Sequence, residues 1–321
     1  MLNNKKPIIA ITGYTGFIGS NFLKKINHNN FKKIYLISRK EKKNESLNTY
    51  KYIRAGYNFK NLIKYKNELS KVDFFFHFNY QNNFIFSNNN PRIDKELNLN
   101  PIKIILNILR PNSLFIFSSS VSVYGSNKNI LSEKSIVSPL SNYDYNKVLC
   151  EKYISIFCKK NKINFLIFRL SNIYGNNYLN LKTKRGFLSD LIFKLLNNKN
   201  IYIDTSGNLL RDYLHVNDCI DAFIKVFKLN KKYFNNLYNL TANKSYSIKQ
   251  IIIIVKIILK KEFKSFSKSK ILYNCKKKIL MTDLRNFKGN SNLYQSISGW
   301  KPTTSIFNGI KMLILLLKIK F

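Results

Sequence analysis

A chain of 321 residues is long enough to bury a large hydrophobic core and to form two closely packed domains. Hydrophobic residues make up 45% of it, which excludes an intrinsically disordered protein. The 55 Lys and Arg against 16 Asp and Glu give a formal net charge of +39, but Lys outnumbers Arg 47 to 8 and no basic block stands apart, so the excess follows the overall composition and predicts no nucleic-acid partner.

The first half of the chain alternates short apolar runs with amphipathic stretches. The runs predict strands at residues 7–12, 33–38, 72–78, 114–118 and 164–170, with a third-strand region near residues 54–58. Helical periodicity predicts helices at residues 17–28, 61–69, 92–109 and 142–160. This alternation indicates βαβ units, and continuous apolar strands are expected where helices cover both faces of a sheet. The predicted fold class is therefore α/β, with a doubly wound parallel sheet.

The second half of the chain is less regular. Helical periodicity returns at residues 187–196, 216–228, 247–260 and 303–318. We predict a first, dinucleotide-binding domain over residues 1–172, to which part of residues 201–230 returns. A smaller C-terminal α/β substrate domain is predicted over residues 173–321.

A glycine-rich turn, GYTGFIG, links the first predicted strand to the first predicted helix. Gly13 can adopt a positive φ, Gly16 lets the backbone approach a pyrophosphate, and Gly19 permits close helix–strand packing. The helix N-terminus adds N–H donors and a positive dipole end. The context favours a dinucleotide site over a purely structural turn. The predicted cofactor-binding residues of the turn are Gly13, Thr15, Gly16, Phe17, Ile18 and Gly19.

The second predicted strand ends in Ser38, Arg39 and Lys40, without an acidic residue. An acid at this place would bind the ribose 2′-hydroxyl of NAD, whereas a hydroxyl and two cations suit the 2′-phosphate of NADP. We therefore predict that Ser38 and Arg39 bind NAD(P), and Arg39 favours NADP over NAD.

Tyr143 and Lys147 lie one helical turn apart, so both side chains project from one face of the predicted helix. A nearby ammonium lowers the cost of forming a phenolate and can also hold a ribose hydroxyl of the nicotinamide half of the cofactor. Ser120, just past a strand, could hydrogen-bond the same substrate oxygen. The alternative is an ordinary helix surface, but together with the glycine turn the trio favours acid–base catalysis.

With these motifs the chain resembles the extended short-chain dehydrogenase/reductase family, specifically its NAD(P)-dependent nucleotide-sugar epimerases and dehydratases. The resemblance covers nearly the whole chain and implies a Rossmann-type first domain. The segments that carry it are residues 12–19 (TGYTGFIG), 118–125 (SSSVSVYG), 169–175 (RLSNIYG), 211–218 (RDYLHVND) and 299–302 (GWKP).

The resemblance also implies roles for single residues. It selects Ser120 as the catalytic serine and leaves Ser118 and Ser119 to strand-end packing. Asn98 matches a position close to the cofactor. The resemblance places His215 in a structural motif, and we expect both His215 and His77 to be structural and not catalytic bases.

Three residues are predicted to bind the substrate besides Ser120. The resemblance places Asn172 near the diphosphate of a nucleotide sugar and Arg211 in the family's substrate-binding motif. Arg211 and Arg285 are rare arginines in a Lys-rich chain, and a planar guanidinium can bind a diphosphate with two parallel hydrogen bonds. The alternative for both arginines is a structural salt bridge.

The chain departs from the family pattern after His77, where the family usually has two small residues against the cofactor. Asn79 and Tyr80 stand there, and Tyr80 would crowd a dinucleotide unless the loop moves. This departure keeps open a dinucleotide-binding scaffold or regulatory protein without catalysis. The intact set of Ser120, Tyr143 and Lys147 argues against that alternative.

The residues after Ser120 bear on the reaction. Val121 and Ser122 stand where the family's 4,6-dehydratases carry an acid pair, so elimination of water lacks its acid and base. Two reactions remain: a nucleotide-sugar 4-epimerase with NAD, and an NADPH-dependent nucleotide-4-keto-sugar reductase. The motif set favours the epimerase, whereas Arg39 favours the reductase.

The four cysteines show no metal-ligand spacing, which predicts no metal site and a reducing compartment. The longest apolar runs, residues 251–259 and 312–317, are too short to span a bilayer. We therefore expect a cytoplasmic enzyme with no membrane partner. The fold suggests a homodimer formed through the helices at residues 92–109 and 142–160.

Overall fold

The computed structural model describes residues 6–39, 48–56, 59–126, 129–175, 186–264, 267–275 and 280–318. The chain forms two compact units. Unit 1 contains residues 1–123, 141–169 and 228–238, and unit 2 contains residues 124–140, 170–227 and 239–321.

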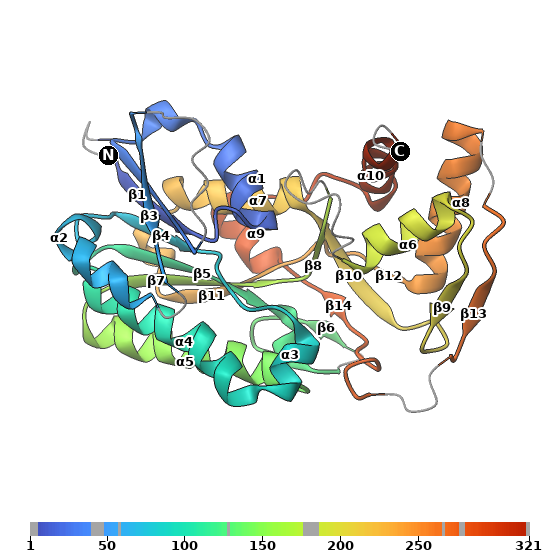
Figure 1. Ribbon diagram of the computed structural model, residues 1–321, viewed down its shortest axis with the longest axis horizontal. Helices are drawn as coiled ribbons and strands as arrows, with labels where there is room; N and C mark the ends of the chain where they lie inside the picture. The colour runs from blue at the N-terminus through green and yellow to red at the C-terminus, as the bar shows by residue number, and fades with distance from the viewer. Residues whose placement is uncertain are drawn as a thin grey trace. The chain divides into compact units, whose positions relative to one another are not determined.

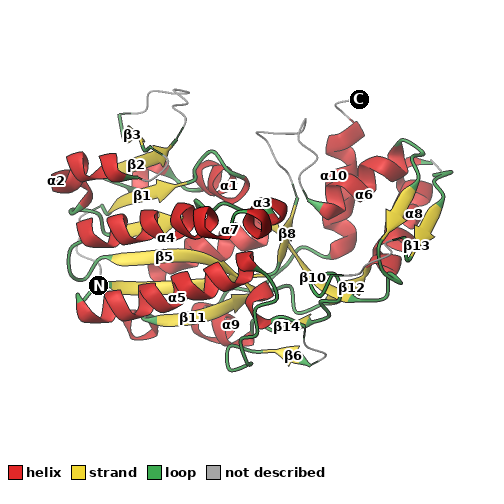
Figure 2. Cartoon of the chain, turned by 60° about the horizontal axis from the view of Figure 1, so that its bottom comes forward, coloured by secondary structure: helices red, strands yellow, loops and turns green. Residues whose placement is uncertain are grey.

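Unit 1, which contains the N-terminal strands in blue in Figure 1, is built on a seven-stranded sheet with the strand order β11-β7-β5-β4-β1-β2-β3 (Figure 2). The strands are β1 (Ile8–Thr12), β2 (Lys33–Ser38), β3 (Tyr50–Arg54), β4 (Phe74–His77), β5 (Leu114–Ser120), β7 (Asn164–Leu170) and β11 (Asn236–Leu240). The pairs β1–β2, β1–β4, β2–β3 and β4–β5 are parallel. The predicted α/β fold is confirmed. The third strand begins at Tyr50, earlier than the region expected at residues 54–58. Residues 57–58 of that region lie outside the described residues. Strand β11 was not predicted.

Helices cover both faces of this sheet. Helix α1 (Phe17–Lys25) lies on one face, and α4 (Pro91–Ile108) and α5 (Asn142–Lys160) pack side by side on the other (Figures 1 and 2). Two shorter helices complete the unit: α2 (Lys66–Leu69) and α3 (Phe84–Asn89). Residues 60–65 form a 3₁₀ helix before α2, so the helix predicted at residues 61–69 is split in two.

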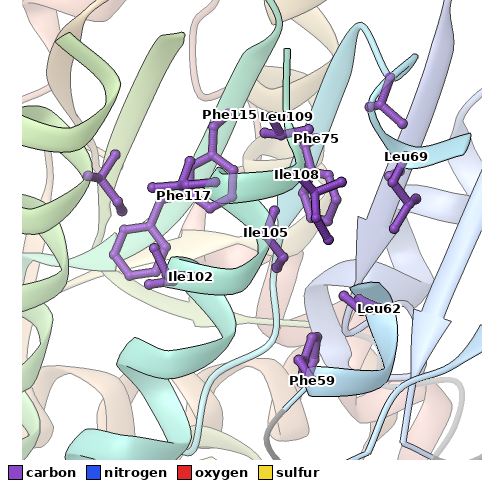
Figure 3. Close-up of a cluster of buried hydrophobic side chains, with 14 of the residues drawn as sticks. Phe59, Leu62, Leu69, Phe75, Ile102, Ile105, Ile108, Leu109, Phe115 and Phe117 are labelled. Carbon is purple, nitrogen blue, oxygen red and sulfur yellow. The ribbon is translucent and has the colours of Figure 1, made fainter. Parts of the chain in front are cut away.

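The core of unit 1 lies between the sheet and the pair α4–α5. Phe75, Phe115 and Phe117 project from β4 and β5 toward Ile102 and Ile105 of α4 (Figure 3). All five side chains are buried. Burying an aromatic or aliphatic side chain of this size contributes about 1.5–3 kcal/mol, so this face fixes α4 and α5 against the ends of the strands that carry the site.

Unit 2 combines small sheets with five helices among its described residues. Its sheets are β12-β10-β8, β13-β9 and β14-β6, with bounds β6 (Ile130–Leu131), β8 (Asn172–Tyr174), β9 (Ile201–Ile203), β10 (Leu210–His215), β12 (Ser245–Ser247), β13 (Ile271–Tyr273) and β14 (Lys288–Gly289). Its helices are α6 (Phe187–Leu196), α7 (Val216–Lys225), α8 (Ile248–Phe263), α9 (Asn292–Ser298) and α10 (Ile306–Lys318). Nowhere in the described ranges is a helix both long and apolar enough to cross a membrane.

Candidate active site

The turn after β1 brings backbone directly against backbone. Gly13 has a φ of +69°, and a Cβ on it would lie 2.8 Å from the backbone nitrogen of Asn79. A Cβ on Gly19 would collide with the carbonyl oxygen of Gly13. Only glycine tolerates these positions. The turn therefore lies against the loop that follows β4, and the start of α1 lies against the end of β1.

The N-terminus of α1 opens into this turn. Its N-cap, Gly16, has no side chain to cap the helix, and its own N–H donates to the carbonyl oxygen of Gly13 at 2.9 Å. The first turn of an α-helix leaves N–H groups without intrahelical partners at the positive end of the dipole. A pyrophosphate fits such a cradle, because the glycines let it approach the backbone donors closely. The predicted residues Thr15, Phe17 and Ile18 lie in this same segment.

Ser38 and Arg39 lie at the carboxyl end of β2. Ser38 is buried and its carbonyl oxygen accepts a hydrogen bond from the Ala55 N–H at 2.9 Å, whereas Arg39 is exposed. In parallel sheets of this kind, the end of the second strand is where the adenosine ribose of a dinucleotide lies. Lys40 lies outside the described residues.

Lys147 projects from the first half of α5 toward β5, and Tyr143 lies one turn before it on the same helix. The ammonium Nζ of Lys147 donates to the carbonyl oxygen of Ser118 at 2.7 Å and lies 5.8 Å from the ring centroid of Tyr143. Lys147 is only 3% exposed. The ammonium thus lies against the strand that ends in Ser120 and near the Tyr143 ring.

The three serines of β5 have different partners. The Ser118 hydroxyl donates to the carbonyl oxygen of His77 at 3.3 Å, and the Ser119 hydroxyl donates to Glu151 Oε1 at 2.5 Å. The Ser120 Oγ accepts the Ser122 N–H at 3.2 Å, which leaves its own proton to donate to another group. Ser120 is also the partly exposed one of the three.

Burial lowers the pKa values of both Lys147 and His77. Loss of solvation lowers the pKa of its ammonium to about 7, against the opposing effects of Cys150, Glu151 and Asp94. The same cause, with the positive charge of Lys147, lowers the pKa of His77 to about 3, so its imidazole is neutral. A lysine whose pKa lies near neutrality is matched to assisting proton transfer.

Tyr80 follows Asn79, whose backbone lies against Gly13, and its ring contacts both Tyr143 and Lys147. The ammonium of Lys147 is 3.4 Å from the ring centroid of Tyr80, a close cation–π contact. The Tyr80 and Tyr143 rings meet edge to face with centroids 5.5 Å apart. The residue expected to crowd the cofactor thus covers the lysine expected to hold it.

A buried carboxylate that sequence reasoning missed fixes this region. Asp94 of α4 accepts hydrogen bonds from Gln81 Nε2 at 2.8 Å, Ser87 Oγ at 2.8 Å, Asn98 Nδ2 at 3.2 Å and Asn146 Nδ2 at 2.6 Å. These donors come from the loop after β4, from α3, from α4 itself and from α5. The signal in the sequence was an Asp and an Asn four residues apart on one helix face, which alone is too common to interpret.

Asn98, predicted to lie close to the cofactor, has buried partners. Its Oδ1 accepts the Gln81 N–H at 2.7 Å, and its amide nitrogen donates to Asp94. Its side chain is 1% exposed. The bonds show Asn98 fixing the loop that carries Asn79 and Tyr80.

The remaining predicted residues lie in unit 2. Asn172 of β8 donates from its amide to the carbonyl oxygen of Asp212 at 3.1 Å. Arg211 of β10 donates to the carbonyl oxygens of Leu210 at 2.9 Å and Asp283 at 3.2 Å. Burial lowers the pKa of Arg211 to about 10, and the positive charge of Arg285 acts in the same direction. A bound anion would lower the electrostatic repulsion between these two guanidinium groups.

His215 is buried, and its Nδ1 accepts the Asn217 N–H at 3.3 Å at the start of α7. This bond caps the helix. His77 is also buried, but within the described ranges only one of its ring nitrogens has a partner. Its Nδ1 lies 2.8 Å from Thr12 Oγ1, while its Nε2 has no hydrogen-bond partner among the described residues.

Comparison with solved structures supports the fold. A UDP-glucose 4-epimerase from Thermotoga maritima, solved with UDP-glucose, superposes with a TM-score of 0.80 over 98% of this chain and 99% of the other, at 20% identity. A UDP-N-acetylglucosamine 4-epimerase from Methanobrevibacter ruminantium gives a TM-score of 0.82 over 99% of this chain and 100% of the other, also at 20% identity.

Sequence comparison identifies the family. A candidate UDP-glucose 4-epimerase of Methanocaldococcus jannaschii is 30% identical over 254 residues, which cover 78% of this chain and 81% of that protein. The UDP-glucose 4-epimerase of Mycoplasma genitalium is 29% identical over 248 residues, covering 70% and 72%. A model of the NAD dependent epimerase/dehydratase family matches residues 9–240. The predicted resemblance is confirmed: the chain belongs to the NAD dependent epimerase/dehydratase family.

Proposed function

We propose that the protein is an NAD(P)-dependent nucleotide-sugar 4-epimerase acting on a UDP-sugar. The observation that carries the proposal is the contact of Lys147 with both Tyr143 and the end of β5, in the same unit as the glycine cradle. The names of the two most similar relatives cited above support the choice of a UDP-sugar.

The residues of unit 1 would divide the chemistry between them. Bound NAD(P) supplies a hydride acceptor that returns the hydride to the other face of the sugar ring. Tyr143 takes the proton of the C4 hydroxyl as the hydride leaves and gives it back afterwards. Lys147 stabilises the phenolate and binds the ribose of the cofactor, and Ser120 donates a hydrogen bond to the C4 oxygen.

The cofactor would extend from the glycine cradle to Lys147. Gly13, Thr15, Gly16, Phe17, Ile18 and Gly19 would hold the pyrophosphate, Ser38 and Arg39 the adenosine ribose, with Asn98 supporting the loop between. Solved relatives such as MoeE5 contain NAD, while Arg39 suits the extra phosphate of NADP. We propose residues 1–172, with part of residues 201–230, as the cofactor domain and residues 173–321 as the substrate domain. Asn172 at the boundary, with Arg211 and Arg285, would bind the diphosphate.

An NADPH-dependent 4-keto-sugar reductase is the second candidate, favoured by Arg39. A dTDP-4-dehydro-6-deoxyglucose reductase of Escherichia coli is also similar, with 26% identity over 203 residues. The reductase consumes one NADPH for each product, whereas the epimerase shows no net redox change.

Incubation with UDP-, GDP- and dTDP-sugars, with and without NADPH, separates the candidates. An epimerase yields an isomer of unchanged mass, identified by NMR, and a reductase yields a product heavier by two hydrogens. Absence of both reactions with every sugar would favour a non-catalytic dinucleotide-binding protein.

Replacement of Tyr143 by Phe tests the mechanism directly. We expect Tyr143→Phe to lower kcat by about two to four orders of magnitude, because the proton acceptor is removed, while NAD(H) binding persists. Equal turnover by this variant would contradict the assigned role of Tyr143.

We further propose a cytoplasmic homodimer. The thiols Cys150, Cys158 and Cys219 are free and buried, which suits a reducing compartment. Ile93 of α4 and Ile156 of α5 are large apolar side chains that are 50% and 70% exposed, which suits an interface through these helices.

A further inference from the structure

The ammonium of Lys147 is enclosed on two sides by its own unit. On one side it donates to the carbonyl oxygen of Ser118 at 2.7 Å, and on another it faces the ring of Tyr80 at 3.4 Å from the centroid. The Phe117 ring lies 4.8 Å from the same nitrogen. A buried ammonium needs such partners because water no longer solvates it.

The backbone on both sides of Tyr80 is held in place. Before it, the Asn79 N–H donates to Thr12 Oγ1 at 3.4 Å, and this backbone lies against Gly13. After it, the Gln81 N–H donates to Asn98 at 2.7 Å and the Gln81 amide donates to Asp94 at 2.8 Å. Movement of Tyr80 is thereby confined to its side chain.

The Tyr80 hydroxyl, in contrast, is poorly accommodated. It is buried and has no hydrogen-bond partner within the part of the chain that the structure describes. A buried hydroxyl without a partner costs free energy, roughly 1–3 kcal/mol. The ring is therefore held by its contacts with Lys147, Tyr143 and Phe117 and by packing against the core of unit 1, not by its polar end. The unpartnered hydroxyl favours rotation of the side chain when another ligand satisfies the ammonium.

We propose that Tyr80 is a displaceable cap on Lys147, whose ring occupies the face of the ammonium that the nicotinamide ribose requires, so that residue 80 sets the affinity for the dinucleotide. The proposal rests on the proposed function, because it takes Lys147 to bind that ribose. Tyr80 acts here as a positioning residue. The position is one where the resemblance leads us to expect a small side chain, so the cap is a property of this chain.

Equilibrium binding of NADH, followed by nicotinamide fluorescence, tests the cap without any turnover. We expect Tyr80→Ala to lower the dissociation constant roughly 10- to 30-fold, because the competing cation–π contact is lost. Tyr80→Phe keeps the ring and removes the buried hydroxyl, so it should leave NADH binding unchanged or weaken it, and should not tighten it as Tyr80→Ala does. Tyr80→Val, which removes the ring but retains apolar volume, should follow Tyr80→Ala; thermal unfolding establishes that each variant is folded.

Binding of ADP provides the internal control, since ADP would fill the cradle but lacks the nicotinamide ribose. Tyr80→Ala should leave the ADP dissociation constant unchanged. A general loosening of the fold would instead change the dissociation constants of both ADP and NADH. Tyr145→Ala is the matched surface variant, because Tyr145 lies on the same helix as Lys147 and is 58% exposed. It should leave NADH binding unchanged.

The outcomes separate the two proposals. NADH affinities that are equal or lower in folded Tyr80→Ala and Tyr80→Val would overturn the cap while leaving the dinucleotide site intact. Failure of every variant to bind NADH and ADP would overturn the cradle and, with it, the cap. Tighter NADH binding with unchanged ADP binding would support both.

Discussion

The ammonium of Lys147 is destabilised in the folded protein, because it is buried and has lost its solvation by water. Its folded-state pKa, about 7, lies below its ordinary value of 10.5. Between these values the unfolded chain binds a proton that the folded chain does not. The stability of the folded protein therefore falls as the pH falls from 10.5 toward 7, and this penalty is complete below that range.

Replacement of Lys147 by Met should show this penalty as a pH-dependent gain in stability. The free energy of unfolding of Lys147→Met, minus that of the parent protein, should rise by up to about 1.4 kcal/mol for each pH unit as the pH is lowered from 10 to 8. Urea unfolding over this pH range measures the difference. Lys152→Met is the control, because Lys152 lies on the same helix and is exposed. If the change in the free energy of unfolding depended as little on pH in Lys147→Met as in Lys152→Met, the buried ammonium would be contradicted.

At the scale of elements, Asp94 joins the loop after β4 to three helices. Four donors converge on its two carboxylate oxygens, and the carboxylate is 0% exposed. Such a group fixes the loop and the α4–α5 pair only while every donor is satisfied. The geometry of the Tyr143–Lys147 pair thus depends on a residue outside it.

We expect Asp94→Ala to lower the free energy of unfolding by about 3–5 kcal/mol, because it leaves buried donors without an acceptor. Glu96 is the matched control: it lies on the same helix, is 57% exposed, and pairs with Arg92 at 3.5 Å. Glu96→Ala should cost about 0.5 kcal/mol or less. Chemical denaturation of both variants compares them, and equal losses would remove the special role of Asp94.

The elements also show what the sequence could predict. Helices α5 and α6 have the predicted bounds, because long periodic segments define their own faces. Strand β11 was missed, because Asn236–Leu240 is short, contains two asparagines and pairs with a distant segment. The contact of Tyr80 with Lys147 and the bond of Asp94 to Asn146 were beyond prediction, because both depend on packing of α5 against residues far from it in the sequence.

At the scale of the whole molecule, the proposed contacts to the cofactor and to the diphosphate of the substrate belong to different units. The cradle and Lys147 lie in unit 1, and Arg211 and Arg285 lie in unit 2. A variant in one unit should therefore affect one ligand. Arg211 is the sharper choice, because the hydrogen bonds of its guanidinium within the described residues go to backbone carbonyl oxygens.

We expect Arg211→Ala to weaken UDP binding by about 10- to 100-fold, the loss typical of a charge-assisted hydrogen-bond pair, with NADH binding unchanged. Calorimetric titration of both ligands measures the two effects. Arg110→Ala, which removes an exposed partner of Asp73 in unit 1, should leave UDP binding as it is. Loss of both ligands in Arg211→Ala would indicate a folding defect and contradict the assignment.

The most direct test of the proposed reaction follows one atom. UDP-glucose carrying deuterium at C4 is incubated with the protein and NAD, and the product is examined by NMR and mass spectrometry. The proposed hydride transfer predicts the C4 epimer with its deuterium retained and its mass unchanged, formed about two to four orders of magnitude more slowly by Tyr143→Phe. Absence of the epimer, or its formation with loss of the deuterium to solvent, would contradict the proposed function.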